Sequence, residues 1–347
     1  MSTTQLAHSR AEADAIVAAA TAGDEPAFSR LVDRHRREIQ VHCYRMLGSF
    51  EDSEDLTQET FLRAWRKRAG YEGRSSFRAW LYRIATNACL DALERRRRQV
   101  PDRHRAPASD PGAPLRSPAE VPWLQPYPDR LLEGIPASDA EPDAAVVAKE
   151  TIELAFLVAI QHMPPRQRAV LILRDVLGWS AKDSAALLEA SVPSVNSALQ
   201  RARVALKEHL PERRTEWAAA DASEQERVLV RLYIEASERA DADALADLMR
   251  EDARFSMPPQ PGTYVGRDAI VASWKEGGFG TEEFRDFRCV ATRANMQPAV
   301  ACYRRRPGRS EYEPLALDVI RIEGSVVTEI TAFPPVVFRA FELPATL

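Results

Sequence analysis

The period of the hydrophobic pattern changes along the chain, and this change constrains the fold more than any other feature. Apolar residues recur at helical spacing through residues 21–98 and again through residues 150–212. After about residue 285 the pattern becomes strand-like, in the runs FRCVATR, PAVACYRR, LALDVIRI and SVVTEITAF. The last two runs flank Glu323-Gly324, which is typical of a hairpin turn. The pattern therefore predicts two all-helical modules and a later domain with an antiparallel sheet.

Breaks in the pattern predict where the domains begin and end. Helices at about 224–239 and 242–249 precede the strands, which is typical of an α+β domain. The predicted segments are an N-terminal tail (1–20), a helical module (21–98), a linker (99–149), a second helical module (150–212), a short linker (213–222) and the α+β domain (223–347). The long linker is rich in Pro, Ala, Ser and Asp and is predicted to lack regular structure. Its VPWLQPYPD run nevertheless holds Trp123 and Tyr127, which a spacer does not need.

The composition excludes several classes of protein. The formal net charge is -4, so any nucleic-acid role must depend on local charge. The 4 cysteines lie too far apart for a zinc or CxxC pattern, which indicates reduced thiols in a cytosolic protein. No apolar run reaches the ~18 residues of a membrane span, and the first residues do not resemble a signal peptide. We expect a cytoplasmic protein without membrane contact, metal or cofactor.

The stretch RSSFRAWLYRIATNACLDALERRRR, residues 74–98, combines aromatic rings with a block of arginines. Leu81, Ile84 and Ala85 lie on the packed face of the predicted helix. Trp80, Arg83 and Asn87 follow another stripe. Rings can stack on unpaired bases, at ~1–3 kcal/mol each, while cations bind the phosphates. The alternative is that the rings belong to the core and that the arginines form a solvated helix end.

Residues 164–210 read as three short helices with turns at Gly178 and before Ser191. Ser191 is a plausible N-cap, and Pro193 is tolerated in a first helical turn. The last helix is predicted to turn Ser194, Asn196, Ser197, Gln200, Arg201 and Lys207 outward. Such a helix suits a helix-turn-helix that reads the major groove, because Asn and Gln pair with adenine and Arg pairs with guanine. The alternative is an ordinary helical bundle with a polar exterior.

Several motifs together resemble a known family. DSEDLTQETFLRAW, FRAWLYRIATNACLDALERRRR, MPPRQRAVLILRDVLGWSAKDSAALL and VNSALQRARVAL, in this order and spacing, resemble bacterial sigma-70 family factors of the extracytoplasmic-function (ECF) group. The remainder resembles a SnoaL-like (NTF2-like) extension, as in the SigG-type subgroup. The resemblance implies a multidomain chain with a sigma-2 helical bundle, a sigma-4 helix-turn-helix and an α+β conical barrel. It also implies binding to core RNA polymerase and promoter DNA, −10 melting and transcription initiation, with activity modulated by the C-terminal domain.

The resemblance assigns roles by position. The clamp helices of the largest polymerase subunit would bind Asp52, Asp55, Gln58 and Glu59, and the flap of the second-largest subunit is a further expected partner. The −10 element would be contacted by Arg74, Phe77, Trp80, Arg83, Asn87, Arg95, Arg96 and Arg97. The −35 element would be contacted by Ser194, Asn196, Ser197, Gln200, Arg201 and Arg203. The chain departs from the family at Asn196 and Ala198, where basic residues are frequent, and at Glu189-Ala190, where Gly is usual.

The C-terminal domain is not expected to be an enzyme. All 6 histidines precede residue 210, so the domain lacks the side chain best suited to proton transfer at neutral pH. Asp268, Asp318 and Glu329 remain as acids, and Asp318 is the best placed of them to face a cavity; the alternative is that it lies at the surface or is satisfied within the core. The rings of Tyr264, Trp274, Phe287 and Tyr303 would line a pocket or fill the core.

Three functions therefore compete. The leading one is a sigma factor whose activity is modulated by its C-terminal domain, and whether a small-molecule ligand in the pocket of that domain takes part is left open. A stand-alone helix-turn-helix regulator that senses a small molecule is the main alternative, and a SnoaL-like enzyme fused to a DNA-binding module is the third. The acidic helix around Asp55 favours the first, because a stand-alone regulator has no use for a polymerase-docking face.

Overall fold

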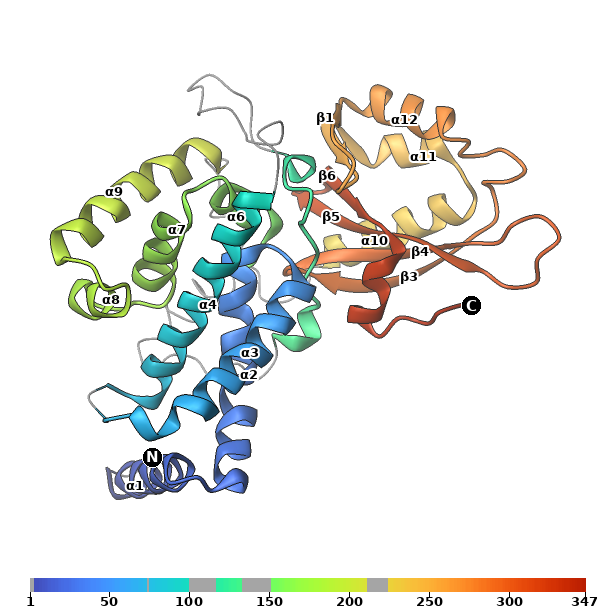
Figure 1. The fold of residues 1–347 in the computed structure, drawn as a ribbon. Coiled ribbons are helices and arrows are strands. Elements are labelled where there is room, and N and C mark those ends of the chain that lie inside the picture. Colours follow the sequence, from blue (N-terminus) through green and yellow to red (C-terminus); the bar gives the residue numbers. More distant parts are fainter. Residues whose placement is uncertain (1–2, 74, 100–116, 133–150, 211–223) are drawn as a thin grey trace.

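The computed structural model describes residues 3–73, 75–99, 117–132, 151–210 and 224–347. Figure 1 shows the two helical modules packed together as one lobe and the α+β domain as a second lobe. The segment 117–132 runs between the two lobes. The multidomain fold class expected from the sequence is confirmed.

The first helical module contains four helices. They are α1 (Thr3–Thr21), α2 (Glu25–Leu47), α3 (Phe50–Lys67) and α4 (Phe77–Gln99), with a 3-10 turn at Arg68–Gly70. The Asp24 side chain caps α2 and the Ser49 side chain caps α3, and each accepts a hydrogen bond from a backbone N–H of the first turn. Residues 1–20 were expected to be a tail, but most of them form α1, whose Ala20 is only 1% exposed. The prediction missed this helix because its apolar residues form no strong stripe.

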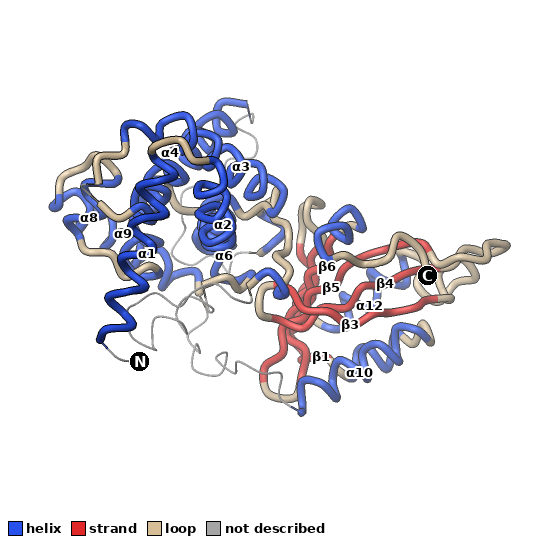
Figure 2. Tube along the Cα trace, turned by 90° about the horizontal axis from the view of Figure 1, so that it is seen from below, coloured by secondary structure: helices blue, strands red, loops and turns tan. Residues whose placement is uncertain are grey.

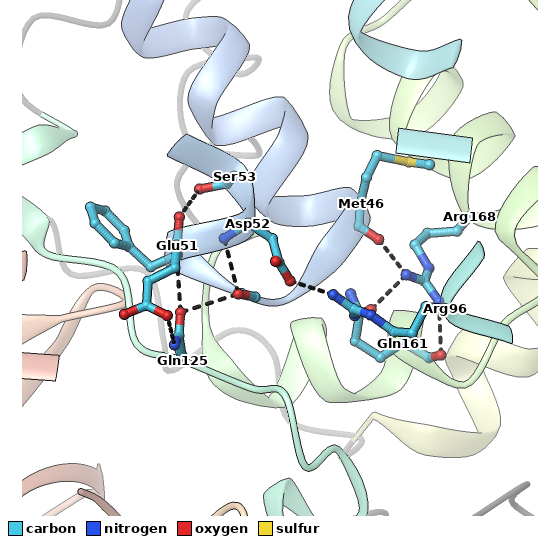
Figure 3. A network of polar contacts seen from close by, with 10 residues as sticks. Met46, Glu51, Asp52, Ser53, Arg96, Gln125, Gln161 and Arg168 are labelled. Atoms are coloured by element: carbon cyan, nitrogen blue, oxygen red, sulfur yellow. Dashed lines mark hydrogen bonds and ion pairs between the residues drawn. The ribbon is translucent and has the colours of Figure 1, made fainter. Parts of the chain in front are cut away.

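The second helical module packs directly on the first. It contains α6 (Leu154–Gln161), α7 (Pro165–Leu171) with a π-helical turn at Ile172–Val176, α8 (Ala181–Leu187) and α9 (Val192–His209). The buried guanidinium of Arg168 donates hydrogen bonds to the Met46 carbonyl at the end of α2 and to Gln161 (Figure 3). Gly48 leaves room for this contact, since a Cβ there would lie 3.0 Å from the Gln161 side chain. The two modules therefore meet at the α2–α3 corner.

The connecting segment is ordered over 117–132, contrary to the prediction of an irregular linker. It forms 3-10 turns at Pro118–Glu120 and Asp129–Leu131 and buries the side chains of Val121, Leu124 and Tyr127. Its Gln125 side chain accepts hydrogen bonds from the Ser49 hydroxyl and the Glu51 amide at the start of α3 (Figure 3). The other predicted linker positions, 100–116, 133–149 and 213–222, lie outside the described residues.

The C-terminal domain is an α+β fold with one mixed sheet. Its elements are α10 (Glu224–Glu238), α11 (Ala242–Asp247), β1 (Met249–Ser256), β2 (Thr263–Val265), α12 (Arg267–Glu276), β3 (Phe287–Ala294), β4 (Gln297–Arg304), β5 (Glu313–Glu323), β6 (Val326–Phe333) and a 3-10 segment at Pro335–Phe341. The strand order is β2-β1-β6-β5-β4-β3. The predicted hairpin at Glu323-Gly324 is confirmed. The expectation of a purely antiparallel sheet is wrong, because β1 pairs with β6 in parallel.

The sheet is covered on both faces, which explains the unbroken apolar run on β4. Val300 and Cys302 point toward the helices of the domain, whereas Ala301 and Tyr303 belong to the core shared with the helical modules. A strand buried on both faces needs apolar residues at every position. Figure 2 shows α10 running along one side of the sheet.

Candidate functional site

The acidic helix α3 presents part of the predicted polymerase-docking face. Asp55 and Gln58 are exposed to solvent. Asp52 instead forms an ion pair with Arg96 of α4 (Figure 3), and the Glu59 carboxylate accepts a hydrogen bond of 2.7 Å from Arg63. Two of the four predicted side chains are therefore exposed for a partner, and the other two are engaged within the module.

The aromatic residues of α4 divide between core and surface. Phe77 is 6% exposed and Tyr82 is 1% exposed, with its hydroxyl donating to the Glu38 carboxylate at 3.2 Å. Trp80 is half-buried and contacts the rings of Tyr71 and Phe77. The core alternative therefore holds for Phe77 and Tyr82, while Trp80 keeps part of its surface.

The polar side of α4 is exposed where the −10 residues were predicted. Arg83, Asn87, Arg95 and Arg97 are all exposed. Arg96 lies 5.1 Å from the Trp123 ring in addition to its pair with Asp52. Arg74 lies outside the described residues.

The arginine block at the end of α4 is partly balanced by an acid of the same helix. Hydrogen bonds from Arg97 and Arg98, together with their charge, lower the pKa of the exposed Glu94 carboxyl to about 2. The carboxylate therefore stays ionised at neutral pH and offsets one cation of the block.

The predicted recognition helix α9 has its polar face in solvent. Ser194, Asn196, Ser197, Gln200, Arg201 and Arg203 are all exposed, and Val195, Leu199 and Ala202 point inward. Ser191 caps the helix as expected, since its hydroxyl accepts from the Ser194 amide. Glu189 lies where the family usually has Gly, and it adopts the left-handed conformation with φ 52°. The turn is therefore formed without Gly, at a cost of ~1–2 kcal/mol.

The two candidate DNA-binding surfaces contact each other. The Arg83 guanidinium on α4 lies 2.6 Å from the Glu189 carboxylate in the turn that precedes α9. Behind this pair, the Tyr82 ring contacts the Trp179 ring with centroids 5.5 Å apart. Arg203 of α9 is also engaged, through two hydrogen bonds to Asp175 at 2.7 and 2.8 Å.

The C-terminal domain binds the helical lobe through the tip of its β3–β4 hairpin, which we call the Asn295 latch (Asn295 and Met296 with Tyr44, Tyr127, Asp129 and Ile152). Asn295 is fully buried, and its Oδ1 accepts from the Tyr127 amide at 2.8 Å. Its Nδ2 donates to the Tyr44 hydroxyl at 2.9 Å and to the Ile152 carbonyl at 2.6 Å. One side chain therefore joins α2, the connecting segment and the start of the second module.

A buried carboxylate completes the Asn295 latch. Asp129 accepts hydrogen bonds from the Met296 amide at 2.8 Å and from Arg293 at 3.3 Å. Burial raises the pKa of Asp129 to about 6, although these hydrogen bonds and the charge of Arg293 act in the opposite direction. No sequence pattern marked Asp129 or Tyr44. The pair Asn295-Met296 between two strand-like runs was the available signal, because Asn favours the left-handed residues of a tight hairpin turn.

The C-terminal domain also contains a cavity of about 420 Å³. Asp318, the acid considered best placed for a cavity, lines it together with Tyr264, Trp274 and Phe287. Tyr303 lies in the core instead, where its hydroxyl donates to the Pro344 carbonyl. Asp268 is exposed, and Glu329 lies 3.4 Å from Arg321.

The described residues lack two other kinds of feature. They contain no group of three or more His, Cys, Asp or Glu side chains that could hold a metal ion. Among the helices they form, none is long and apolar enough to cross a membrane.

Three domain families match the chain, one for each helical module and one for the C-terminal domain. Sigma-70 region 2 matches residues 31–99, Sigma-70 region 4 matches residues 153–206, and the SnoaL-like domain matches residues 230–330. None of the three matches indicates an enzyme family.

Curated proteins and solved structures agree with these matches. The chain is 41% identical to the ECF RNA polymerase sigma factor SigG of Mycobacterium tuberculosis H37Rv, over 96% of this chain and 90% of that protein. It is 31% identical to the ECF RNA polymerase sigma factor SigW of Bacillus subtilis 168, over 54% of this chain and 91% of that protein. The fold resembles the crystal structure of Mycobacterium tuberculosis SigJ, with a TM-score of 0.56 and 20% identity over 91% of this chain and 99% of that one.

Proposed function

The chain belongs to the ECF group of RNA polymerase sigma factors, and we propose that its C-terminal domain holds it in a closed form that cannot read a promoter. In the open form, α3 docks on the clamp helices of the largest polymerase subunit, α4 reads and melts the −10 element, and α9 reads the −35 element. Transcription initiation then takes place in the cytoplasm on promoter DNA, with the polymerase flap supporting the second helical module.

The contact between Arg83 and Glu189 is the observation that carries this proposal. The two promoter elements lie ~25 base pairs apart by their positions, which is about 85 Å along straight DNA at 3.4 Å per step. The charged groups of Arg83 and Glu189 are 2.6 Å apart. Helix α9 is about 27 Å long at 1.5 Å per residue, so its recognition face cannot reach the second element while the turn that precedes it contacts α4. The modules must separate before both elements are bound.

The strength of each contact identifies what keeps the modules together. The Arg83–Glu189 pair is mostly exposed, and such surface pairs contribute only ~0–1 kcal/mol. The buried polar contacts described above are those of Arg168 with the α2–α3 corner and those of the Asn295 latch with α2, the connecting segment and Ile152. Because the latch contacts a residue from each module, it supports the proposal that the C-terminal domain determines the fraction of closed molecules.

The polymerase-docking step is tested by reversing charge on α3. We expect Asp55→Arg to abolish co-purification with core polymerase while leaving the fold intact, because Asp55 is exposed and its replacement disturbs no core contact. The control is Asp33→Arg, the same charge change at an exposed residue of α2. Retained binding of Asp55→Arg would move the docking face elsewhere. Failure of the unchanged protein to bind core enzyme would favour the stand-alone regulator.

The regulatory step is tested by transcription in vitro with core enzyme. Full-length protein is compared with a truncation near residue 215, and promoter opening is measured at equal sigma concentrations. We expect more open complex with the truncated form, because it lacks the latch. Equal promoter opening by both forms would refute the closed form as a regulatory state.

A further inference from the structure

The cavity of the C-terminal domain is lined by aromatic rings that follow one another in space. Tyr264, Phe255, Trp274, Phe279 and Phe287 form an unbroken series of ring contacts with centroids 5.5–6.2 Å apart. At about 420 Å³ the cavity falls in the range of sites that enclose a small organic molecule, roughly 300–1,000 Å³. Shape and lining therefore suit a flat, largely apolar ligand.

A single carboxylate interrupts this apolar lining. Asp318 on β5 lines the cavity, and the Tyr233 hydroxyl of α10 donates to its Oδ2 at 3.0 Å. The Cys302 thiol of β4 lies 3.6 Å from the same oxygen. Among the described residues, both polar contacts of Asp318 go to Oδ2, so Oδ1 keeps its capacity to accept a hydrogen bond.

Among the described residues of the cavity wall, the carboxylate has no cationic partner. Of the described residues that line the cavity, none is arginine, lysine or histidine. The guanidinium of Arg304 stacks on the Phe284 ring at 3.8 Å, but Arg304 is not part of the lining. A buried charge is costly unless it is paired, so this arrangement leaves a place for a positive charge.

We propose that this cavity binds a small aromatic amine whose ammonium group pairs with Asp318 and whose ring system packs on the aromatic lining. The aromatic faces contribute a second attraction to the cation, because a cation within ~6 Å of a ring is drawn to its negative face. Binding at this site stands independently of the closed form proposed above, since it requires only the C-terminal domain of the intact chain.

The protonation of Asp318 provides an independent check. Burial raises the pKa of Asp318 to about 6, although the Tyr233 hydroxyl and the Cys302 thiol act to lower it. The groups that face Asp318 are Tyr233 from α10 and Cys302 from β4, with Cys289 of β3 beyond, 3.6 Å from Cys302. The pKa of the Cys302 thiol is itself raised well above its ordinary value, so the thiol stays neutral at pH 8. At pH 8 the carboxylate is ionised, and at pH 5 it is mostly protonated.

The experiment compares two probes of equal size, tryptamine and tryptophol, by isothermal titration of the full-length protein at pH 8. They differ only in their terminal group, which is an ammonium group in tryptamine and a hydroxyl in tryptophol. We expect tryptamine to bind at least tenfold more tightly, because a hydrogen bond to a charged group is about twice as strong as a neutral one. The preference should fall as the pH is lowered through about 6.

Variants separate the charge from the fold. Asp318→Asn should remove the preference for tryptamine while tryptophol binds as before, and unchanged tryptophol binding also reports that the cavity is intact. Asp268→Asn, at an exposed acid of α12, should leave both affinities unchanged. Three outcomes would overturn the proposal. They are equal binding of the two probes to the unchanged protein, a preference for tryptamine that survives Asp318→Asn, and no binding of either probe at millimolar concentration.

Discussion

Replacing Asn295 by Gly tests whether the Asn295 latch holds the two lobes together. Asn295 has φ 55° and the neighbouring Met296 has φ 61°, so both occupy the left-handed region. Glycine adopts this region without steric cost. Asn295→Gly therefore removes the side-chain contacts without adding backbone strain. Met296→Gly is the matched control, because it places a glycine in the same turn and keeps the backbone bond from residue 296 to Asp129.

The expected size of the effect follows from the three side-chain hydrogen bonds of Asn295. Each contributes ~0.5–1.5 kcal/mol net, so Asn295→Gly should destabilise the contact between the lobes by about 1.5–4.5 kcal/mol. At ~1.4 kcal/mol per factor of ten, the open fraction should rise by one to three powers of ten. Met296→Gly keeps the three hydrogen bonds of Asn295 and removes only the apolar contacts of the half-buried Met296 side chain, so it should raise the open fraction less.

Hydrogen exchange at the N–H of residue 296 measures this opening, because this N–H donates to Asp129 across the contact and neither variant removes its acceptor. The Tyr127 N–H is unsuitable, since Asn295→Gly deletes its own acceptor. We expect the protection of the residue 296 N–H to fall by the same one to three powers of ten in Asn295→Gly. Equal protection of this N–H in the two variants would show that the Asn295 side chain does not hold the lobes, and the reasoning would then be wrong.

Three further outcomes are expected. Asp129→Asn should flatten the pH dependence of lobe opening. In the closed form the pKa of Asp129 is about 6, against an ordinary value of 3.8, so protonation stabilises the closed form. This stabilisation is lost as the pH rises through 6. In the unchanged protein, hydrogen exchange should show the closed form stabilised relative to the open form by about 1 kcal/mol when the pH is lowered from 7.5 to 5. An equal stabilisation in Asp129→Asn would contradict this. Asn87→Ala should reduce discrimination at one −10 position by ~1–3 kcal/mol in open-complex assays, whereas uniform weakening across promoter variants would exclude base reading. A double-mutant cycle of Arg83→Ala and Glu189→Ala should give a coupling below about 1 kcal/mol in urea unfolding, and a larger value would make this pair a main contact of the closed form.

Most helices and most strands could be predicted because their signals are local. The turn at Gly48-Ser49, the cap at Ser191 and the hairpin at Gly324 depend on neighbouring residues, and the structure confirms them. Strand β1 was missed because three charged residues follow Met249 in MREDARFS, and the buried residues Met249, Ala253, Phe255 and Ser256 show no regular alternation. Its parallel pairing with β6 depends on residues more than 70 positions away.

The candidate surfaces on α4 and α9 were predictable because motif residues sit on one helix face. The Asn295 latch was not, because the partners of Asn295 are separated from it by 168 residues at Tyr127 and 251 residues at Tyr44. The burial of Phe77 was also hidden, since a ring near a helix start looks the same whether it packs inward on Tyr71 or faces solvent. Contacts between distant segments depend on the three-dimensional arrangement and leave no local trace.

The β3–β4 hairpin links the cavity to the connecting segment by a single rigid rod. Phe287 and Cys302 line the cavity near one end, and the two strands stay paired in unbroken register up to Ala294 and Gln297, beside Asn295 at the other end. Seven residues of extended chain span about 23 Å. One continuous pair of strands therefore joins the wall of the cavity to the residue that contacts both helical modules.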